Sequence, residues 1–228
     1  MADLTIIYLT ANLLPAKFAS YQRGILLEAA GDYPIISVSR KPMEFGYMSL
    51  LDAEPKSLSN IYFQMLKAAR YTETEFVAVA EDDCFYHTDH FKFHRPKPDT
   101  FAYDQNRLAL FTWGKPTYHW RNRKSNCSLI APTKLLIESL EERFTKWPNG
   151  TPEDRTGELG RQMVEDNLRI TRRKSKEVFC DISIIQFNHD FGSEERQRNH
   201  KKSMGSLRAY DIPHWGKAKD VVSLFYEH

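Results

Sequence analysis

Hydrophobic and polar positions divide the chain into short apolar runs and longer stretches with helical spacing. Residues 4–10, 33–40 and 76–80 are short runs of mostly apolar residues, typical of strands buried on both faces. Residues 16–30 and the stretch from Ser57 to Ala69 repeat apolar side chains at intervals of three and four, the stripe of an amphipathic helix. This β-α-β-α-β order predicts an α/β protein with a mixed, mostly parallel sheet flanked by helices.

The second half of the chain is less regular. Apolar runs at residues 107–113, 126–132 and 178–187 predict three further strands. Helical spacing predicts helices over residues 134–144 and from about residue 158 to 172.

Composition and the amino-terminal segment narrow the class of protein. With 228 residues and 41% hydrophobic residues, the chain can bury a sizeable core. Its first residues have no basic region and an apolar run too short to span a bilayer, which predicts a cytoplasmic protein without a membrane partner. Three widely spaced cysteines without a CxxC pair indicate neither a disulfide framework nor a zinc site.

The net charge of +2 hides an asymmetry between the two halves. Residues 1–114 hold 11 Lys+Arg and 14 Asp+Glu (net −3), whereas residues 115–228 hold 21 and 16 (net +5), which together give +2. The second half is therefore expected to face something anionic or to carry basic loops.

Three adjacent carboxylates follow the predicted strand 76–80: Glu81, Asp82 and Asp83. In open α/β sheets, ligands bind beyond the carboxyl ends of the strands. Neighbouring carboxylates repel one another unless a cation compensates, and their oxygens suit Mg²⁺ or Mn²⁺ shared with a substrate phosphate. The alternative is that one acid caps the following turn while the others are solvated. No glycine-rich phosphate loop occurs in the sequence.

The sequence resembles glycosyltransferases of the GT-A fold at three motifs in order: EDD (81–83), VEDNLRITRRK (164–174) and QFNHDFG (186–192). Within that fold it is similar to the inverting enzymes that add N-acetylglucosamine in N-glycan processing. The resemblance implies a GT-A fold, a nucleotide-sugar donor, usually a UDP-sugar, and Mn²⁺ or Mg²⁺. It also implies that Asp83 binds the metal, that Glu81 lies near the ribose or a metal-bound water, and that Asp82 lies near the donor sugar.

Further donor contacts are expected at the ends of the first two strands. The resemblance implies that Thr10, Asn12 and Arg40 hold the base and phosphates. His189 follows a predicted strand, where many enzymes of this fold place a late metal ligand. A lone histidine is also often a structural hydrogen-bonding partner, so both interpretations of His189 stay open.

Asp166 is the predicted catalytic base. At about 100° per residue from Leu159, Asp166 falls inside the apolar stripe of the predicted helix, whereas Glu165 falls outside it. Partial burial raises the pKa of a carboxyl toward values suited to a base that deprotonates an acceptor hydroxyl. The alternative is a structural pair of Asp166 with Arg169.

Residues 113–124 combine four cations with three aromatic rings and no acid, and predict the acceptor site. Nucleic acids, with phosphates for cations and bases for stacking, fit this mixture, as do sugars; a surface loop is the structural alternative. The chain also looks like phage enzymes that glucosylate hydroxymethylated pyrimidines in DNA. The predicted acceptor-binding residues are Trp113, Tyr118, Trp120, Arg121, Arg123 and Lys124.

Three functions follow from these patterns. The first is an inverting, metal-dependent hexosyltransferase acting on a hydroxymethylated pyrimidine in double-stranded DNA, the second a glycosyltransferase for a cell-surface saccharide or small molecule, and the third a non-catalytic nucleic-acid-binding module. We expect a single domain over residues 1–228, with residues 1–112 binding the nucleotide sugar and residues 113–228 the acceptor. A basic loop over residues 192–206 is expected to close over the diphosphate.

Overall fold

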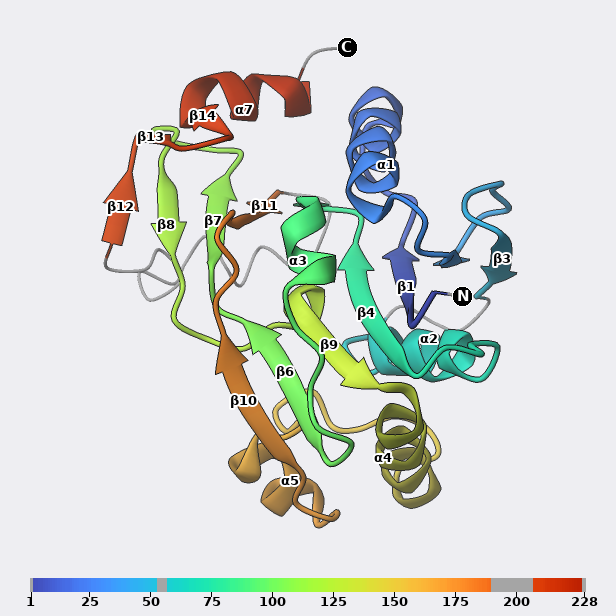
Figure 1. Cartoon of the computed structure of the whole chain (residues 1–228). Helices are drawn as coiled ribbons and strands as arrows, with labels where there is room; N and C mark the ends of the chain where they lie inside the picture. The colour runs from blue at the N-terminus through green and yellow to red at the C-terminus, as the bar shows by residue number, and fades with distance from the viewer. Residues whose placement is uncertain (1, 53–56, 190–206, 227–228) are drawn as a thin grey trace.

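Figure 1 shows the computed structural model, which describes residues 2–52, 57–189 and 207–226. The helices are α1 (Ala16–Ala30), α2 (Asn60–Ala69), α3 (Thr88–Lys92), α4 (Thr133–Lys146), α5 (Gln162–Leu168), α7 (Ala218–Tyr226) and the 3₁₀ turn η1 (Asn126–Ser128). The strands of the first half are β1 (Leu4–Thr10), β2 (Ile35–Ser39), β3 (Met48–Leu51), β4 (Phe76–Glu81), β5 (Cys84–Phe85), β6 (Thr100–Asp104) and β7 (Arg107–Phe111). Those of the second half are β8 (Tyr118–Trp120), β9 (Leu129–Pro132), β10 (Lys174–Val178), β11 (Ile184–Asn188), β12 (Leu207–Ala209), β13 (Asp211–Ile212) and β14 (Gly216–Lys217).

A seven-stranded sheet forms the centre of the molecule, in the order β10-β6-β9-β4-β1-β2-β3. Its neighbouring strands pair in parallel, except that β9 lies antiparallel between β4 and β6. The predicted fold class, a mixed and mostly parallel sheet flanked by helices, is confirmed.

Each face of this sheet is covered by helices because its central strands, β1, β2, β4, β6 and β9, are apolar on both sides. On one face, Val77 and Val79 of β4 belong to a core with α2 and α4. On the other face, Ala78 and Ala80 belong to a core with α1 and Phe91 of α3. These two cores fix the direction of β4, which ends at the acidic triplet.

A five-stranded sheet, in the order β12-β8-β7-β11-β5, lies beside the first. One face is apolar: Leu110, Ile185 and Phe187 pack against Phe18 of α1 and against α7. Because side chains alternate along a strand, the other face carries the intervening residues. Arg107 of β7, His119 of β8 and the β11 residues Gln186 and Asn188 occupy this second face, hereafter the polar face.

The structure corrects three of the predicted elements. The apolar run 178–187 is two strands, because β10 ends at Val178 in the first sheet and β11 begins at Ile184 in the second. The predicted helix 158–172 is α5 alone, since Gly160 has a φ of 72° and Arg169 a φ of 55°. The predicted strand 126–132 begins as the turn η1.

Among the helices of the described residues, none combines the length and apolarity needed to cross a bilayer. The predicted basic loop 192–206 lies outside the described residues.

Candidate functional site

The acidic triplet sits where β4 leaves the first sheet, beside the end of β1. Thr10 Oγ1 donates a hydrogen bond to Asp82 Oδ2 at 2.5 Å, and the backbone N–H of Asp82 donates to Leu9 O at 3.1 Å. These bonds fix the triplet against β1. The structure thus brings two predicted donor-binding residues, Thr10 and Asp82, into direct contact.

Asn12 joins the end of β1 to the end of β2. Its side-chain oxygen accepts hydrogen bonds from the backbone N–H groups of Arg40, at 2.8 Å, and Lys41, at 2.9 Å. Asn12 has a φ of 53°, a left-handed conformation that asparagine adopts more readily than most residues. The predicted residues Asn12 and Arg40 therefore lie together at the same edge of the sheet as the triplet.

Asp83 points toward His189, which follows β11. Asp83 Oδ2 and His189 Nε2 are 3.9 Å apart, and only 18% and 9% of the respective side chains are exposed. The backbone also holds this pair, because the N–H of Phe187 donates to Asp83 O at 2.8 Å. Two bonds of about 2.1 Å to one ion span at most about 4.2 Å, so this oxygen and nitrogen fit a shared Mn²⁺ or Mg²⁺. The two predicted metal ligands are thus neighbours across the two sheets.

The environment of the triplet disfavours three simultaneous negative charges. Burial, followed by the charges of Cys127, Asp83 and Asp82, raises the pKa of Glu81 well above its ordinary value, against the opposing charge of Arg107. Burial likewise raises the pKa of Asp82 to about 6, although the hydrogen bond from Thr10 opposes it. A cation bound at Asp83 would relieve this repulsion.

Two cysteine thiols, of Cys84 and Cys127, lie beside Glu81 of the triplet. One donor atom each of Glu81, Cys84 and Cys127 lies within 4.8 Å of the others. Cys84 Sγ donates to Asp83 Oδ1 at 3.2 Å, and Cys127 Sγ donates to Ser125 Oγ at 3.3 Å. The carboxylate and thiol donors of this cluster would suit a thiophilic ion better than Mg²⁺.

The polar face of the second sheet adds cations to this site. Arg107 is 1% exposed, and its guanidinium donates to Gln186 Oε1 and, at 3.1 Å, to the backbone oxygen of Arg123. Arg121 is 6% exposed and donates to Asn188 Oδ1 at 3.1 Å. Burial, together with the charges of Arg123 and Arg107, lowers the pKa of Arg121 to about 9.

The predicted acceptor segment 113–124 divides between core and surface. Tyr118 is fully buried in the core under α7, so its ring forms no surface platform, contrary to the expected stacking role. The half-buried Trp120 donates from Nε1 to Gln105 O at 2.8 Å, and Trp113 packs edge-on against Phe111. Arg123 is exposed, and the half-buried Lys124 donates to Ser175 Oγ at 2.6 Å.

Asp166 does not lie with these residues. Its side chain is 42% exposed and accepts two hydrogen bonds from Arg172, at 2.6 and 2.9 Å. Because β10 points the same way as β4, α5, which precedes β10, lies at the opposite edge of the sheet from Glu81 (Figure 1).

The prediction that Asp166 lies in the apolar stripe of its helix, and Glu165 outside it, is wrong. Glu165 is 1% exposed and accepts from the backbone N–H groups of Gly160, at 2.8 Å, and Arg173, at 2.9 Å. The left-handed Gly160 lies between Leu159 and the start of α5. Angular positions measured from Leu159 therefore do not apply to the side chains of α5.

Glu158 is a carboxylate that the sequence patterns did not single out. Its side chain is 19% exposed, pairs with Arg161 at 2.7 Å, and lies within electrostatic range of Arg123. Tyr103, near the carboxyl end of β6, holds the next residue by donating to Leu159 O at 2.7 Å. The signal available in the sequence is a pair of flanking glycines, Gly157 and Gly160, which mark a tight turn.

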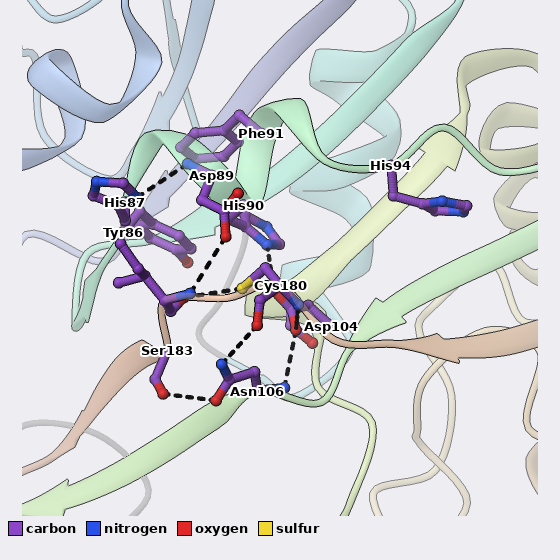
Figure 2. A network of polar contacts seen from close by, with 12 residues as sticks. Tyr86, His87, Asp89, His90, Phe91, His94, Asp104, Asn106, Cys180 and Ser183 are labelled. Carbon is purple, nitrogen blue, oxygen red and sulfur yellow. Dashed lines mark hydrogen bonds and ion pairs between the residues drawn. The ribbon is translucent and has the colours of Figure 1, made fainter. Parts of the chain in front are cut away.

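Figure 2 shows a buried network at the corner between the two sheets. His90 of α3 contacts Asp104 at 3.0 Å, and Asp104 accepts from the backbone N–H of Cys180 at 3.3 Å. Asn106 donates to Cys180 O at 2.7 Å and accepts from Ser183 Oγ at 2.6 Å. The network joins two of the three connections by which the described strands pass from the first sheet to the second, namely β6–β7 and β10–β11; the third, β4–β5, contains Asp82 and Asp83.

Comparisons with known proteins give a likeness of shape only. No family model matches the chain, and no curated protein matches its sequence. A nucleotidyl transferase from Methanothermobacter thermautotroptrophicus is 12% identical, with a TM-score of 0.46 over 80% of this chain and 89% of that one.

Two glycosyltransferases are similar to the same degree. One, involved in the glycosylation of the major capsid of PBCV-1, is 12% identical, with a TM-score of 0.45 over 89% of this chain and 100% of that one. The other, S. aureus TarS residues 1–349 in complex with UDP-GlcNAc, is 11% identical, with a TM-score of 0.45 over 90% of this chain and 62% of that one. Likeness at this level assigns the chain neither to a family nor to an activity.

Proposed function

We propose that the chain is a metal-dependent glycosyltransferase of the GT-A fold, which moves a sugar from a nucleotide-diphosphate sugar to a hydroxyl group. The observation that carries the proposal is the Asp83–His189 pair, 3.9 Å apart at the carboxyl end of β4. Ligands of open α/β sheets bind at this edge, and the ends of β1 and β2 meet there as well.

The proposed roles follow from the position of each side chain. Asp83 and His189 would hold Mn²⁺ or Mg²⁺, which when bound neutralises charge on the leaving diphosphate. Thr10, Asn12 and Arg40 border the space for the nucleoside. Asp82 and Glu81, which the resemblance assigns to the donor sugar and ribose, have raised pKa values and so would favour hydrogen bonding over metal ligation.

Asp166 is a poor candidate for the catalytic base because it lies at the opposite edge of the sheet. An acid that deprotonates the acceptor must reach the hydroxyl directly or through one water. Glu158 is the better candidate among the described residues, since it is largely buried and lies near Arg123 in the second half of the chain. Direct attack by the acceptor would invert the anomeric carbon.

DNA carrying a hydroxymethylated pyrimidine remains our preferred acceptor, with a saccharide or small molecule as the alternative. The net charge of +5 over residues 115–228 and the exposed Arg123 support a polyanionic acceptor. The burial of Tyr118 removes one of the three rings expected to stack on a base. In a non-catalytic nucleic-acid-binding module, the carboxylate–imidazole pair would be structural only.

A panel of nucleotide sugars tests the proposal. The chain is incubated with each sugar and Mn²⁺, with and without hydroxymethylated DNA, and the nucleosides are analysed by mass spectrometry. Transfer or hydrolysis that is lost in Asp83→Ala is expected. Sugar transfer that needs no DNA would favour the alternative acceptors, and DNA binding without turnover of any nucleotide sugar would favour the non-catalytic module.

A further inference from the structure

Two buried arginines face each other across the second sheet. In the antiparallel pairing of β7 with β8, Leu108 lies opposite Trp120, the last residue of β8. Arg121 follows directly, where a continued register would bring it opposite Arg107, and the charge of Arg107 acts on it. Like charges directly opposite in a sheet repel one another, and burial strengthens this repulsion by removing water. Arg107 is 1% and Arg121 6% exposed.

No ion pair compensates the charge of these arginines within the part of the chain that the structure describes. None of the ion pairs formed by the described residues includes Arg107, Arg121 or Arg123. Their hydrogen bonds go instead to the neutral oxygens of Gln186, Asn188 and a backbone carbonyl. Arg107 Nε is buried without any hydrogen-bond partner among the described residues. Buried charges are ordinarily paired, whereas among the described residues the nearby carboxylates of Glu81, which interacts with Arg107, and Glu158, which interacts with Arg123, form no ion pair with these cations.

Arg123 extends the pair toward solvent. Its backbone oxygen accepts from Arg107 at 3.1 Å, and its backbone N–H donates to the oxygen of Arg121 at 2.7 Å. Its own side chain is exposed. The three residues thus form a path of positive charge from the polar face to the surface.

The geometry points to a phosphate-binding site formed by Arg107, Arg121 and Arg123. A guanidinium offers a planar fork of donors that matches phosphate oxygens, and a phosphate with two charges compensates two buried cations better than a carboxylate with one. The assignment of this phosphate to a substrate rests on the proposed function. It comes either from the diphosphate of the donor or from a phosphate of the acceptor, since the site adjoins Glu81 and lies in the predicted acceptor half.

Calorimetric titration with inorganic pyrophosphate, without metal and at low salt, tests the site directly. We expect wild type to bind pyrophosphate, and Arg121→Gln and Arg123→Gln each to bind it at least about tenfold more weakly, because each removes charge-assisted hydrogen bonds. Arg70→Gln is the matched control, since Arg70 is an exposed arginine paired with Glu141. Arg107→Gln is a fourth variant, and the other two keep the test decisive if it fails to fold.

The melting temperature separates a binding role from a structural one. If the arginines serve a phosphate, pyrophosphate raises the melting temperature of wild type and not that of Arg121→Gln. If they serve only the fold, Arg121→Gln melts lower and pyrophosphate has no effect on either protein, which would overturn the inference. Unchanged pyrophosphate affinity in both Arg121→Gln and Arg123→Gln would overturn it as well.

Two further ligands identify the source of the phosphate. UDP with Mn²⁺ and a short DNA duplex are titrated into the same variants: selective loss of UDP affinity assigns the site to the donor, and selective loss of DNA affinity to the acceptor. Arginine-dependent pyrophosphate binding in a protein that turns over no nucleotide sugar would refute the proposed function and leave the phosphate site standing.

Discussion

The two sheets bury their side chains in different ways. The central strands of the seven-stranded sheet are apolar on both faces, so each of them is fixed by two cores, and candidate site residues appear only where these strands end. The five-stranded sheet has one apolar face, and its other face carries Arg107, Gln186 and Asn188, of which Arg107 acts on Glu81 of the triplet by its charge. The first sheet therefore fixes where the strand ends of the candidate site lie, and the second sheet adds charged side chains beside them.

Removal of the carboxylate at the junction of the two sheets should have the largest effect. Asp83→Asn is expected to lower nucleotide-sugar turnover at least about 100-fold, since loss of a direct ligand costs no less than loss of its outer partners. Its Mn²⁺ affinity, measured by calorimetry, should fall in parallel while the urea midpoint stays near that of wild type. Asp99→Asn, an exposed acid paired with Lys174, serves as control. An Asp83→Asn variant that keeps the Mn²⁺ affinity of wild type would show that Asp83 does not bind the metal.

A change within the cores of the first sheet should affect folding and not chemistry. Leu136→Ala removes a fully buried side chain of α4 and should lower the free energy of unfolding by about 2–5 kcal/mol in urea titrations. Leu27→Ala, at an exposed position of α1, should change it far less. A Leu136→Ala variant that remained as stable as wild type but lost Mn²⁺ affinity would contradict the assignment of this core to folding alone.

The contribution of Asp104, at the corner between the sheets, to the free energy of unfolding should decrease at acidic pH. Burial alone would raise the pKa of Asp104, but hydrogen bonds from His90 and Cys180 outweigh it and lower the pKa below the ordinary 3.8. A lowered pKa stabilises the fold above the ordinary value, and this contribution is lost as the pH falls through the folded-state pKa. Asp104→Asn should cost about 1–3 kcal/mol at neutral pH. The difference from wild type in urea titrations should shrink below about pH 4; a pH-independent difference would show that the charge of Asp104 plays no part.

The smallest effect is expected at Asp166. Asp166→Ala removes an exposed pair with Arg172 and should leave turnover within about twofold of wild type and stability without a resolvable change. Glu165→Ala is the informative neighbour, because it deprives two backbone N–H groups of their acceptor and should lower the melting temperature. A large loss of turnover in Asp166→Ala would support Asp166 as the catalytic base, as the sequence predicts.

Sequence patterns located β1, β2, β4 and β9 of the first sheet and missed its strands β3, β6 and β10. The strands at residues 4–10 and 76–80 and the helix 16–30 were predictable because an apolar run or a helical stripe is local to the segment. The division of residues 178–187 between two sheets was not, because Val178 and Ile184 are equally apolar and only their distant partners differ.

The candidate site shows the same limit. Asp83 was identifiable from its place after a buried strand. Arg107 was missed because its register with Arg121 depends on a pairing that no local pattern encodes. Asp166 was misplaced because the periodicity was carried through Gly160, whose left-handed backbone separates Leu159 from α5.

The buried network of Figure 2 has a mechanical consequence. Two of the connections between the sheets, β6–β7 near Asn106 and β10–β11 near Cys180, are hydrogen-bonded to each other, and Gln105 N also donates to Val178 O at 2.8 Å. A hinge needs backbone that is free to rotate, and neither crossing offers it. We therefore expect no hinge motion at this corner, so that opening and closing around a substrate would fall to segments outside it.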